Sequence, residues 1–184
     1  FLSMGYHGFL LDYSVAPNHF PTSVRELALA VAMVREHAEE WHVDPEKIFV
    51  CGFSAAGHLC CSLGEFWNRE FVYGAIGKTP EAIRPSGLIL CYPVITAGGA
   101  AHRGSFDCLV GEQATKEELE QKGKQSQKQA AGKNKYPAED LLEKGRGSGV
   151  TEPVAGGQLW KIDAEGTVRQ VRGNEERAGA GTAG

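Results

Sequence analysis

One serine in this sequence stands where it could act as a nucleophile. The segment "FVCGFSAAGHL" (residues 49–59) places Ser54 directly after an apolar, β-rich run and before a series of helix-forming residues. Its neighbours are small: Gly52, Ala55, Ala56 and Gly57. A nucleophilic serine needs a sharp turn between a strand and a helix, and small neighbours let the two elements approach each other there. The sequence therefore predicts a nucleophile at Ser54.

The helix that follows Ser54 would help the chemistry of acyl transfer. Its first backbone N–H groups have no acceptor within the helix, and its N-terminus carries a partial positive charge. Both features favour an oxyanion in front of the serine. The pattern G-x-S-x-G is met at Gly52 and Ser54, whereas Ala56 stands at its third fixed position and Gly57 follows at once. The alternative interpretation is a serine that caps a packed helix.

The elements around Ser54 follow an alternating order. Residues 8–13 and 86–95 are apolar runs typical of buried strands, and residues 47–53 form a further β-rich run. Residues 22–41 carry apolar side chains at helical spacing. These side chains are Val24, Leu27, Ala28, Val31, Val34 and Ala38. Because strand, helix and strand in this order form parallel βαβ units, we expect an α/β core at residues 1–121. Its sheet is open and mostly parallel, is flanked by helices and has the three strands as neighbours.

The sequence changes character after Gln121. Residues 122–184 are polar and rich in glycine, with few branched apolar side chains to bury. We therefore expect an irregular C-terminal tail there, without a well-formed edge strand. The pieces "PAEDLLEK" and "QLWKIDAEGTVRQV" have the patterns of a helical turn and a hairpin. Neither has an apolar face large enough to fold alone.

Composition and charge narrow the classes of function. The chain has 184 residues, of which 42% are hydrophobic, so it can bury the core of one domain. Its formal net charge of -4 gives no electrostatic basis for binding nucleic acid or an anionic membrane. The basic run at residues 122–135 lacks the interleaved aromatic side chains typical of nucleic-acid binding. No segment reaches the roughly 18 apolar residues of a membrane span. We expect neither partner.

The cysteines predict a reducing environment. They are Cys51, Cys60, Cys61, Cys91 and Cys108. No two form a C-x-x-C pair, and four lie in apolar stretches, which is typical of small buried hydrophobic side chains rather than disulfides. A cytoplasmic location is the corresponding expectation. Histidines, cysteines and carboxylates do not cluster at the short spacing of metal ligands, so no metal site is expected.

Several segments resemble a known group of enzymes. They are "YSVAP" (13–17), "EWHVDPEKIFVCGFSAAGHL" (40–59), "LILCYPVIT" (88–96) and "LVGEQATKEELE" (109–120). They are similar to α/β-hydrolase-fold esterases related to acetylxylan esterases and hormone-sensitive-lipase-like carboxylesterases. The resemblance covers about two thirds of the chain and implies a Ser-His-Asp hydrolase that acts on small acyl esters, acetylated carbohydrates among them. It implies Ser54 as nucleophile, the N–H of Ala55 as an oxyanion donor, and no cofactor.

The sequence also departs from that family. The glycine-rich oxyanion loop of the family precedes the strand at which this chain starts, so we expect an N-terminal truncation and divergence after about residue 120. Family order places the acid and then the base after the nucleophile. Asp163 and Glu165 are faint candidates for the acid, and no histidine follows His102. The family activity is therefore ester hydrolysis, whereas this chain alone is expected to be nearly inactive.

The earlier histidines have simpler interpretations. His58 lies one helical turn beyond Ser54 and is expected to pack or cap rather than to act as the base. His102 lies in a loop after a strand and is the first alternative base. Solvent-exposed positions are expected for His19, His37 and His42. Two other functions stay open: a non-catalytic α/β-hydrolase-like scaffold or interaction protein, and a serine peptidase of the same fold.

Overall fold

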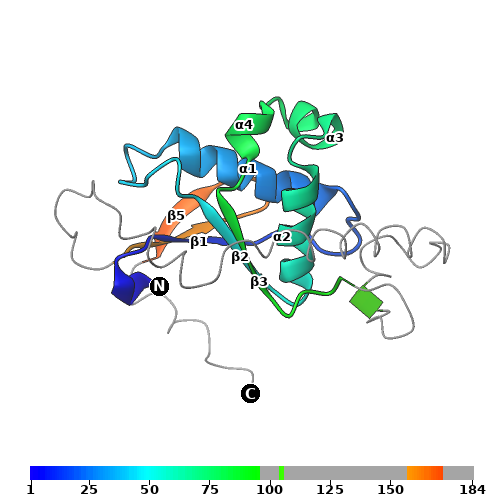
Figure 1. Ribbon diagram of the computed structural model, residues 1–184, viewed down its shortest axis with the longest axis horizontal. Helices are drawn as coiled ribbons and strands as arrows, with labels where there is room; N and C mark the ends of the chain where they lie inside the picture. The colour runs from blue at the N-terminus through cyan, green and yellow to red at the C-terminus, as the bar shows by residue number, and fades with distance from the viewer. Residues whose placement is uncertain (96–103, 106–156, 172–184) are drawn as a thin grey trace, which may run out of the picture. The chain divides into compact units, whose positions relative to one another are not determined.

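The computed structural model describes residues 1–95, 104–105 and 157–171 (Figure 1). The chain divides into two compact units. One comprises residues 1–12 and 149–184, and the other comprises residues 13–148.

A parallel pair of strands forms the centre of the unit 13–148. Its elements are α1 (Thr22–Glu36), β2 (Phe49–Phe53), α2 (Ala55–Phe66), α3 (Glu70–Tyr73), the 3-10 helix η2 (Gly74–Ile76), α4 (Pro80–Ile83) and β3 (Gly87–Cys91). β2 and β3 pair in parallel, with Phe49 opposite Gly87 and Phe53 opposite Cys91. The crossover between these strands contains α2, which packs on both of them. The predicted βαβ arrangement is confirmed for these two strands.

Helix α1 buries the apolar face that its spacing predicted. The six side chains that define this face, from Val24 to Ala38, are all buried, and Ala28 has no exposed surface. The helix ends at Glu36, earlier than the predicted Trp41. The backbone of His37 leaves helical geometry at φ -100° and ψ 18°, and turns follow up to His42. Because Ala38 and Trp41 remain buried in these turns, the apolar pattern continues past the helix itself.

Strand β2 is buried on one face only among the described residues. Val50 and Gly52 are buried, whereas Phe49, Cys51 and Phe53 are exposed, which is the alternation that one covered face produces.

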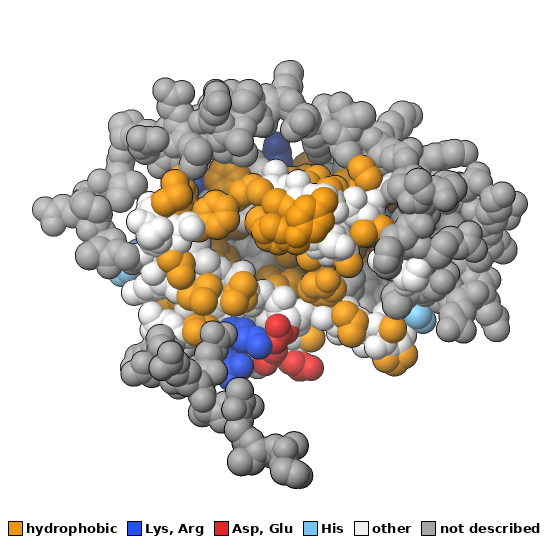
Figure 2. All heavy atoms as spheres, turned by 90° about the horizontal axis from the view of Figure 1, so that it is seen from below, with side chains coloured by type: hydrophobic (Ala, Val, Ile, Leu, Met, Phe, Trp, Pro, Cys, Tyr) orange, Lys and Arg blue, Asp and Glu red, His pale blue; other side chains and the backbone are white. Residues whose placement is uncertain are grey.

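Hydrophobic side chains gather on the molecular surface in the view of Figure 2. Phe53 and Tyr92 are among the exposed large hydrophobic residues of the described part.

The unit that contains the N-terminus is a small mixed sheet. After the 3-10 helix η1 (Leu2–Met4), β1 (Gly8–Leu11) pairs in parallel with β4 (Leu159–Ile162), which pairs antiparallel with β5 (Val168–Val171). Ile162 is almost completely buried, at 2% exposure, and Phe9 stacks on Trp160 with the ring centroids 6.2 Å apart. Lys161 forms an ion pair with Asp12. Distant parts of the chain thus share one sheet.

Within the described residues, the parallel partner of β1 is β4, and β2 pairs in parallel with β3. The expectation of three neighbouring parallel strands is confirmed for β2 and β3 and stays a prediction for β1. A second expectation is wrong. Residues 157–171 are not irregular, because β4 and β5 form the hairpin whose pattern "QLWKIDAEGTVRQV" carried. The hairpin is not isolated: β1 pairs with β4 along its edge. The predicted boundary at 121/122 lies outside the described residues and stays a prediction.

Candidate active site

Ser54 occupies a strained turn between β2 and α2. Its backbone has φ 52° and ψ -116°, a positive-φ conformation that a residue with a side chain adopts only at an energetic cost. Ser54 is exposed, and its side chain makes no capping hydrogen bond to the helix. The predicted position at the strand-to-helix turn is confirmed. Ser54 stands at the N-cap position of α2, but the side-chain hydrogen bond of a capping serine is not formed, and its role as nucleophile stays a prediction.

Two glycines make this turn possible. A β-carbon on Gly52 would collide with the backbone carbonyl of Ala56, so only glycine fits at the strand end. A β-carbon on Gly57 would lie 2.9 Å from the Cβ of Pro93 and 3.1 Å from the Gly52 carbonyl oxygen. Gly57 therefore provides the close approach that the G-x-S-x-G pattern assigns to its last glycine, and Ala56 at that position is tolerated.

The residues after β3 hold the turn in place. We call residues 91–94, which start at the last residue of β3, the strap. The Ser54 N–H donates to the Cys91 carbonyl oxygen over 3.0 Å, and the Val94 N–H donates to the Ser54 carbonyl oxygen over 3.2 Å. Tyr92, between these contacts, has a positive φ of 37°. Ser54 is thus bonded on both sides of its α-carbon to one neighbouring segment.

The start of α2 provides the donors that an oxyanion needs. Ala55 is the first residue of this helix and is exposed. The N–H groups in the first turn of a helix have no acceptor within that helix, and they lie at its positive end. The backbone at Ala55 therefore has the position of an oxyanion donor, immediately after the serine.

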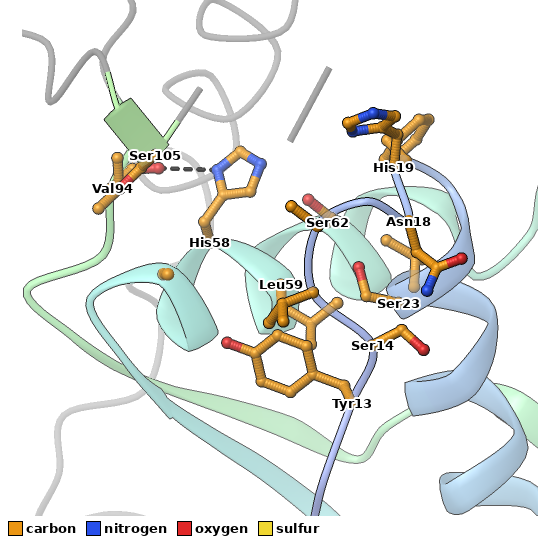
Figure 3. A pocket seen from close by; sticks show the side chains of 15 residues that line it. Tyr13, Ser14, Asn18, His19, Ser23, His58, Leu59, Ser62, Val94 and Ser105 are labelled. Carbon is orange, nitrogen blue, oxygen red and sulfur yellow. Dashed lines mark hydrogen bonds between the residues drawn. The ribbon is translucent and has the colours of Figure 1, made fainter. Parts of the chain in front are cut away.

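A pocket lies beside the turn (Figure 3). Its volume is about 120 Å³, and Ala55 lies in its wall. The other lining residues come from five parts of the chain: Tyr13, Ser14, Val15, Ala16, Asn18, His19 and Phe20 before α1; Ser23 and Val24 of α1; His58, Leu59 and Ser62 of α2; Val94 after β3; and Ser105. The surface that the wall exposes to the pocket is mostly apolar, although about half of the lining residues carry a polar group. This composition suits a small ligand with an apolar group.

A pair of hydrogen bonds fixes one side of the pocket. Glu26 of α1 accepts from the Ser14 backbone N–H over 2.7 Å and from the Ser14 hydroxyl over 2.6 Å. Ser14 belongs to the segment "YSVAP", so the carboxylate anchors the loop that forms the pocket wall. This pair was not predicted from the sequence. A serine in that segment and a carboxylate in the second turn of the next helix could have indicated it.

Burial controls the ionisation of two groups near the pocket. It raises the pKa of the Cys60 thiol to about 12, and the neighbouring Cys51 and Cys61 thiols add to that rise. Burial also raises the pKa of Tyr13, with a smaller contribution from Cys60. Because the thiolate is the nucleophilic form of cysteine, Cys60 is a packing residue and not a second nucleophile.

The histidines lie in different settings. His58 is buried at 8% exposure, and its Nδ1 lies 2.7 Å from the Val94 carbonyl oxygen, so its expected packing role is confirmed. His19, His37 and His42 are exposed as expected, and His19 lines the pocket. His102 lies outside the described residues. No residue is thereby assigned as the base, which stays a prediction.

The candidate acids lie on the hairpin between β4 and β5. The Thr167 N–H donates to the Asp163 carboxylate over 2.7 Å, and the Gly166 N–H donates to the Asp163 carbonyl over 3.0 Å. Asp163 therefore shapes the turn, which explains an aspartate there without catalysis. Glu165 is exposed at the turn. The identity of the acid stays a prediction.

No group of three or more histidine, cysteine or carboxylate side chains in residues 1–95, 104–105 and 157–171 could hold a metal ion. Within the same ranges, no helix has both the length and the apolar character to cross a membrane.

A serine on a strained turn from a parallel strand into a helix defines the nucleophile turn of an α/β-hydrolase. Residues 1–83 match the family model BD-FAE. The chain is 33% identical over 128 residues to endo-1,4-beta-xylanase B of Butyrivibrio fibrisolvens, covering 65% of this chain and 19% of the relative. It is 26% identical over 110 residues to acetylxylan esterase of Xylanibacter ruminicola, covering 59% of this chain and 20% of the relative. The resemblance to α/β-hydrolase-fold esterases is confirmed.

Solved structures are similar as well. One of them is the acetyl ester-xyloside bifunctional hydrolase from Caldicellulosiruptor lactoaceticus, with 32% sequence identity, a TM-score of 0.47, and coverage of 56% of this chain and 38% of that chain. This chain spans about a fifth of the length of the curated relatives, at 19% and 20%.

Proposed function

We propose that this chain carries the nucleophile of a carboxylic ester hydrolase that acts on small acyl esters. Ser54 is the nucleophile and the N–H of Ala55 is one oxyanion donor. The acyl group passes through a covalent intermediate on Ser54, in a Ser-His-Asp mechanism. The observation that carries the proposal is the backbone of Ser54, at φ 52° and ψ -116°, in an exposed turn before a helix.

The strain is the reason why this backbone supports a nucleophile. A helix-capping serine needs neither positive φ nor a hydroxyl free of the cap, and Ser54 has both features. Residues in sparsely populated conformations persist only where the surrounding structure holds them, and they are frequent at active sites. Here Gly52, Gly57 and the strap supply that surrounding structure.

The chemistry uses the turn and the start of α2. The Ser54 hydroxyl attacks the ester carbonyl carbon, and the negative charge that develops on the carbonyl oxygen faces the N–H of Ala55. Collapse of this intermediate breaks the bond to the alcohol and leaves an acyl group on Ser54. Water then attacks the acyl-enzyme, releases the carboxylic acid and restores the serine. A base must take the hydroxyl proton in the first step.

The substrate class rests on two supports. A relative named acetylxylan esterase points to acetylated carbohydrates as candidates. The pocket of about 120 Å³ beside Ala55 suits a short acyl group, since a cavity of about 150 Å³ already holds benzene. We therefore place short-chain esters, and acetylated sugars among them, first in the series to be tested.

A covalent serine probe tests the proposal directly. The chain is incubated with a fluorophosphonate, and the adduct is mapped by mass spectrometry after digestion. This chain alone is expected to be nearly inactive, so the expected result is slow modification of Ser54, with no adduct in the Ser54→Ala variant. The residual hydrolysis of p-nitrophenyl acetate, butyrate and octanoate then orders the acyl groups by length, with Ser54→Ala as the matched control.

Three results would contradict the proposal. An unmodified Ser54 in the folded chain would favour the scaffold alternative. Equal labelling of the wild type and of Ser54→Ala would place the reactive group elsewhere. Cleavage of peptide substrates without ester hydrolysis would favour a peptidase.

A further inference from the structure

His58 stands at the centre of a small hydrogen-bonded ring. Its backbone N–H donates to the Ser54 carbonyl oxygen over 3.1 Å, the usual bond of a first helical turn. Its side chain reaches away from the helix to the strap, where Nδ1 lies 2.7 Å from the Val94 carbonyl oxygen (Figure 3). The Val94 N–H donates to the same Ser54 carbonyl oxygen. Three residues are thereby joined into one closed set.

The direction of the side-chain bond fixes the chemical form of Nδ1. A carbonyl oxygen only accepts hydrogen bonds, so Nδ1 of His58 must carry a hydrogen and donate it to Val94. Because Nδ1 already carries a hydrogen, it has no free lone pair with which to accept a proton. The bond therefore has a structural direction, from the helix to the strap, and Nδ1 is not the atom that removes a proton from Ser54.

The hydrogen bonds among Ser54, His58 and Val94 support the backbone of Ser54, the proposed nucleophile. Ser54 has positive φ, so its conformation needs outside support to persist. The strap gives that support, because Cys91 and Val94 bond to the N–H and the carbonyl of Ser54. Pro93, between them, packs against Gly57 at the first turn of α2. The side chain of His58 ties the strap to α2 by a hydrogen bond.

We propose that His58 is a positioning residue for Ser54: its ring N–H holds Val94 and thereby keeps the strap bonded to the turn. The role as a positioner of a nucleophile rests on the function proposed for Ser54. The support that His58 gives to the turn does not, and it can be measured without catalysis. This role differs from that of a base, which would need to face the Ser54 hydroxyl.

Amide hydrogen exchange on the intact chain tests the proposal. The variant His58→Leu removes the ring N–H with an apolar side chain of similar size, and His58→Asn keeps an N–H donor near the position of Nδ1. In His58→Leu the amides of Ser54 and Val94 should exchange about tenfold faster, whereas in His58→Asn they should stay within about threefold of the wild type. The amide of Val31, in the core of α1, should not change in either variant.

A matched control removes the same kind of bond elsewhere. The Nδ1 of His37 donates to the Met33 carbonyl oxygen over 3.0 Å, at the exposed end of α1. His37→Leu should leave the exchange of the Ser54 and Val94 amides unchanged. Fluorophosphonate labelling of Ser54 should slow about tenfold in His58→Leu and recover in His58→Asn, because the orientation of the serine follows its backbone.

The outcomes separate the two proposals. Unchanged exchange at Ser54 and Val94 in a folded His58→Leu variant overturns the role of His58. Failure of His58→Asn to restore the labelling rate, with normal exchange, also overturns it and indicates a role in proton transfer. If His58→Leu does not fold, the wild-type ¹⁵N spectrum decides, because an Nδ1 without hydrogen contradicts the bond. Absence of labelling in the wild type, with faster exchange in His58→Leu, overturns the nucleophile alone.

Discussion

The backbone carbonyl of Ala56 lies so close to the α-carbon of Gly52 that a β-carbon cannot be placed between them. Gly52 is the fourth residue of β2 and Ala56 is the second residue of α2, so the contact joins the two elements across the turn that holds Ser54. The strained backbone of Ser54 depends on this approach. A residue larger than glycine at position 52 must push the helix away from the strand.

Gly52→Ala is therefore expected to destabilise the protein strongly. The new methyl group meets backbone atoms that cannot move aside, and the free energy of unfolding should fall by about 3 kcal/mol. Urea denaturation followed by circular dichroism measures this loss. Gly74→Ala is the matched control: Gly74 has helical angles of φ -67° and ψ -38°, and its new methyl group would meet only the flexible side chain of Glu70. A loss of similar size in both variants would contradict the account.

Ser54→Gly separates strain from chemistry. Glycine adopts positive φ without a steric penalty, so this variant should be more stable than Ser54→Ala by about 1 to 2 kcal/mol. Both variants lack the hydroxyl and should resist fluorophosphonate labelling equally. Thermal denaturation of the pair gives the difference in stability. Equal melting temperatures would show that the turn stores no strain at this residue.

The turn at Ser54 could be predicted from the sequence because its determinants are local. Small residues within three positions of the serine allow the turn, and the apolar run before it predicts the strand. The buried face of α1 was equally clear, since Val24, Ala28 and Val31 recur at helical spacing. In both cases the information lies within a few residues of the element that it specifies.

The partner of β1 could not be predicted in the same way. β1 and β4 are separated by almost the whole chain, and β4 has four residues in a region poor in apolar side chains. Its burial centres on Ile162, and one side chain gives no periodicity. The hairpin lacks a large apolar face, and its β4 edge is instead held by backbone hydrogen bonds to β1. Such bonds do not depend on residue type, so the sequence does not reveal them.

The support for the nucleophile was hidden for a related reason. The strap holds Ser54 through the backbone of Cys91 and Val94, and His58 bonds to a carbonyl that any residue at position 94 would carry. Pro93 is the one residue of the strap whose type indicates a turn after the strand. Ser14 and Glu26 are residue types that form hydrogen bonds, but the path of the loop between them, which brings them together, could not be predicted.

Glu26→Gln tests the anchor of the pocket wall. Both carboxylate oxygens of Glu26 accept hydrogen bonds from Ser14, whereas an amide presents one acceptor and turns a donor toward the other N–H or O–H group. The free energy of unfolding should fall by about 2 kcal/mol, as expected for a half-buried bond to a charged group. Glu39→Gln, at an exposed position, serves as the control and should have no effect.

A double-mutant cycle shows whether the effect belongs to the pair. If Glu26 acts through Ser14, the losses in Ser14→Ala and Glu26→Gln should not add in the double variant. Full additivity, measured by urea denaturation, would contradict a direct coupling between the two side chains.

Cys60 predicts a loss of stability at alkaline pH. The pKa of its thiol rises from 9.0 in the unfolded chain to about 12 in the folded protein, mainly because the side chain is buried. Below pH 9 the thiol is protonated in both states, so the stability it contributes is fully present. Between pH 9 and about 12 the unfolded chain releases the proton and the folded protein keeps it, so the free energy of unfolding falls as the pH rises. The limiting slope for one such group is about 1.4 kcal/mol per pH unit.

Urea denaturation at pH 7 to 11, with a phosphine reductant to prevent disulfide formation, measures that slope. The raised pKa values of Tyr13 and Cys51 act in the same direction, so the wild type alone does not isolate Cys60. Cys60→Ala removes the ionisable group, and its stability should decline less steeply above pH 9 than that of the wild type. Parallel pH profiles for the two proteins would mean that the Cys60 thiol ionises as easily in the folded protein as in the unfolded chain, and the burial argument would fail.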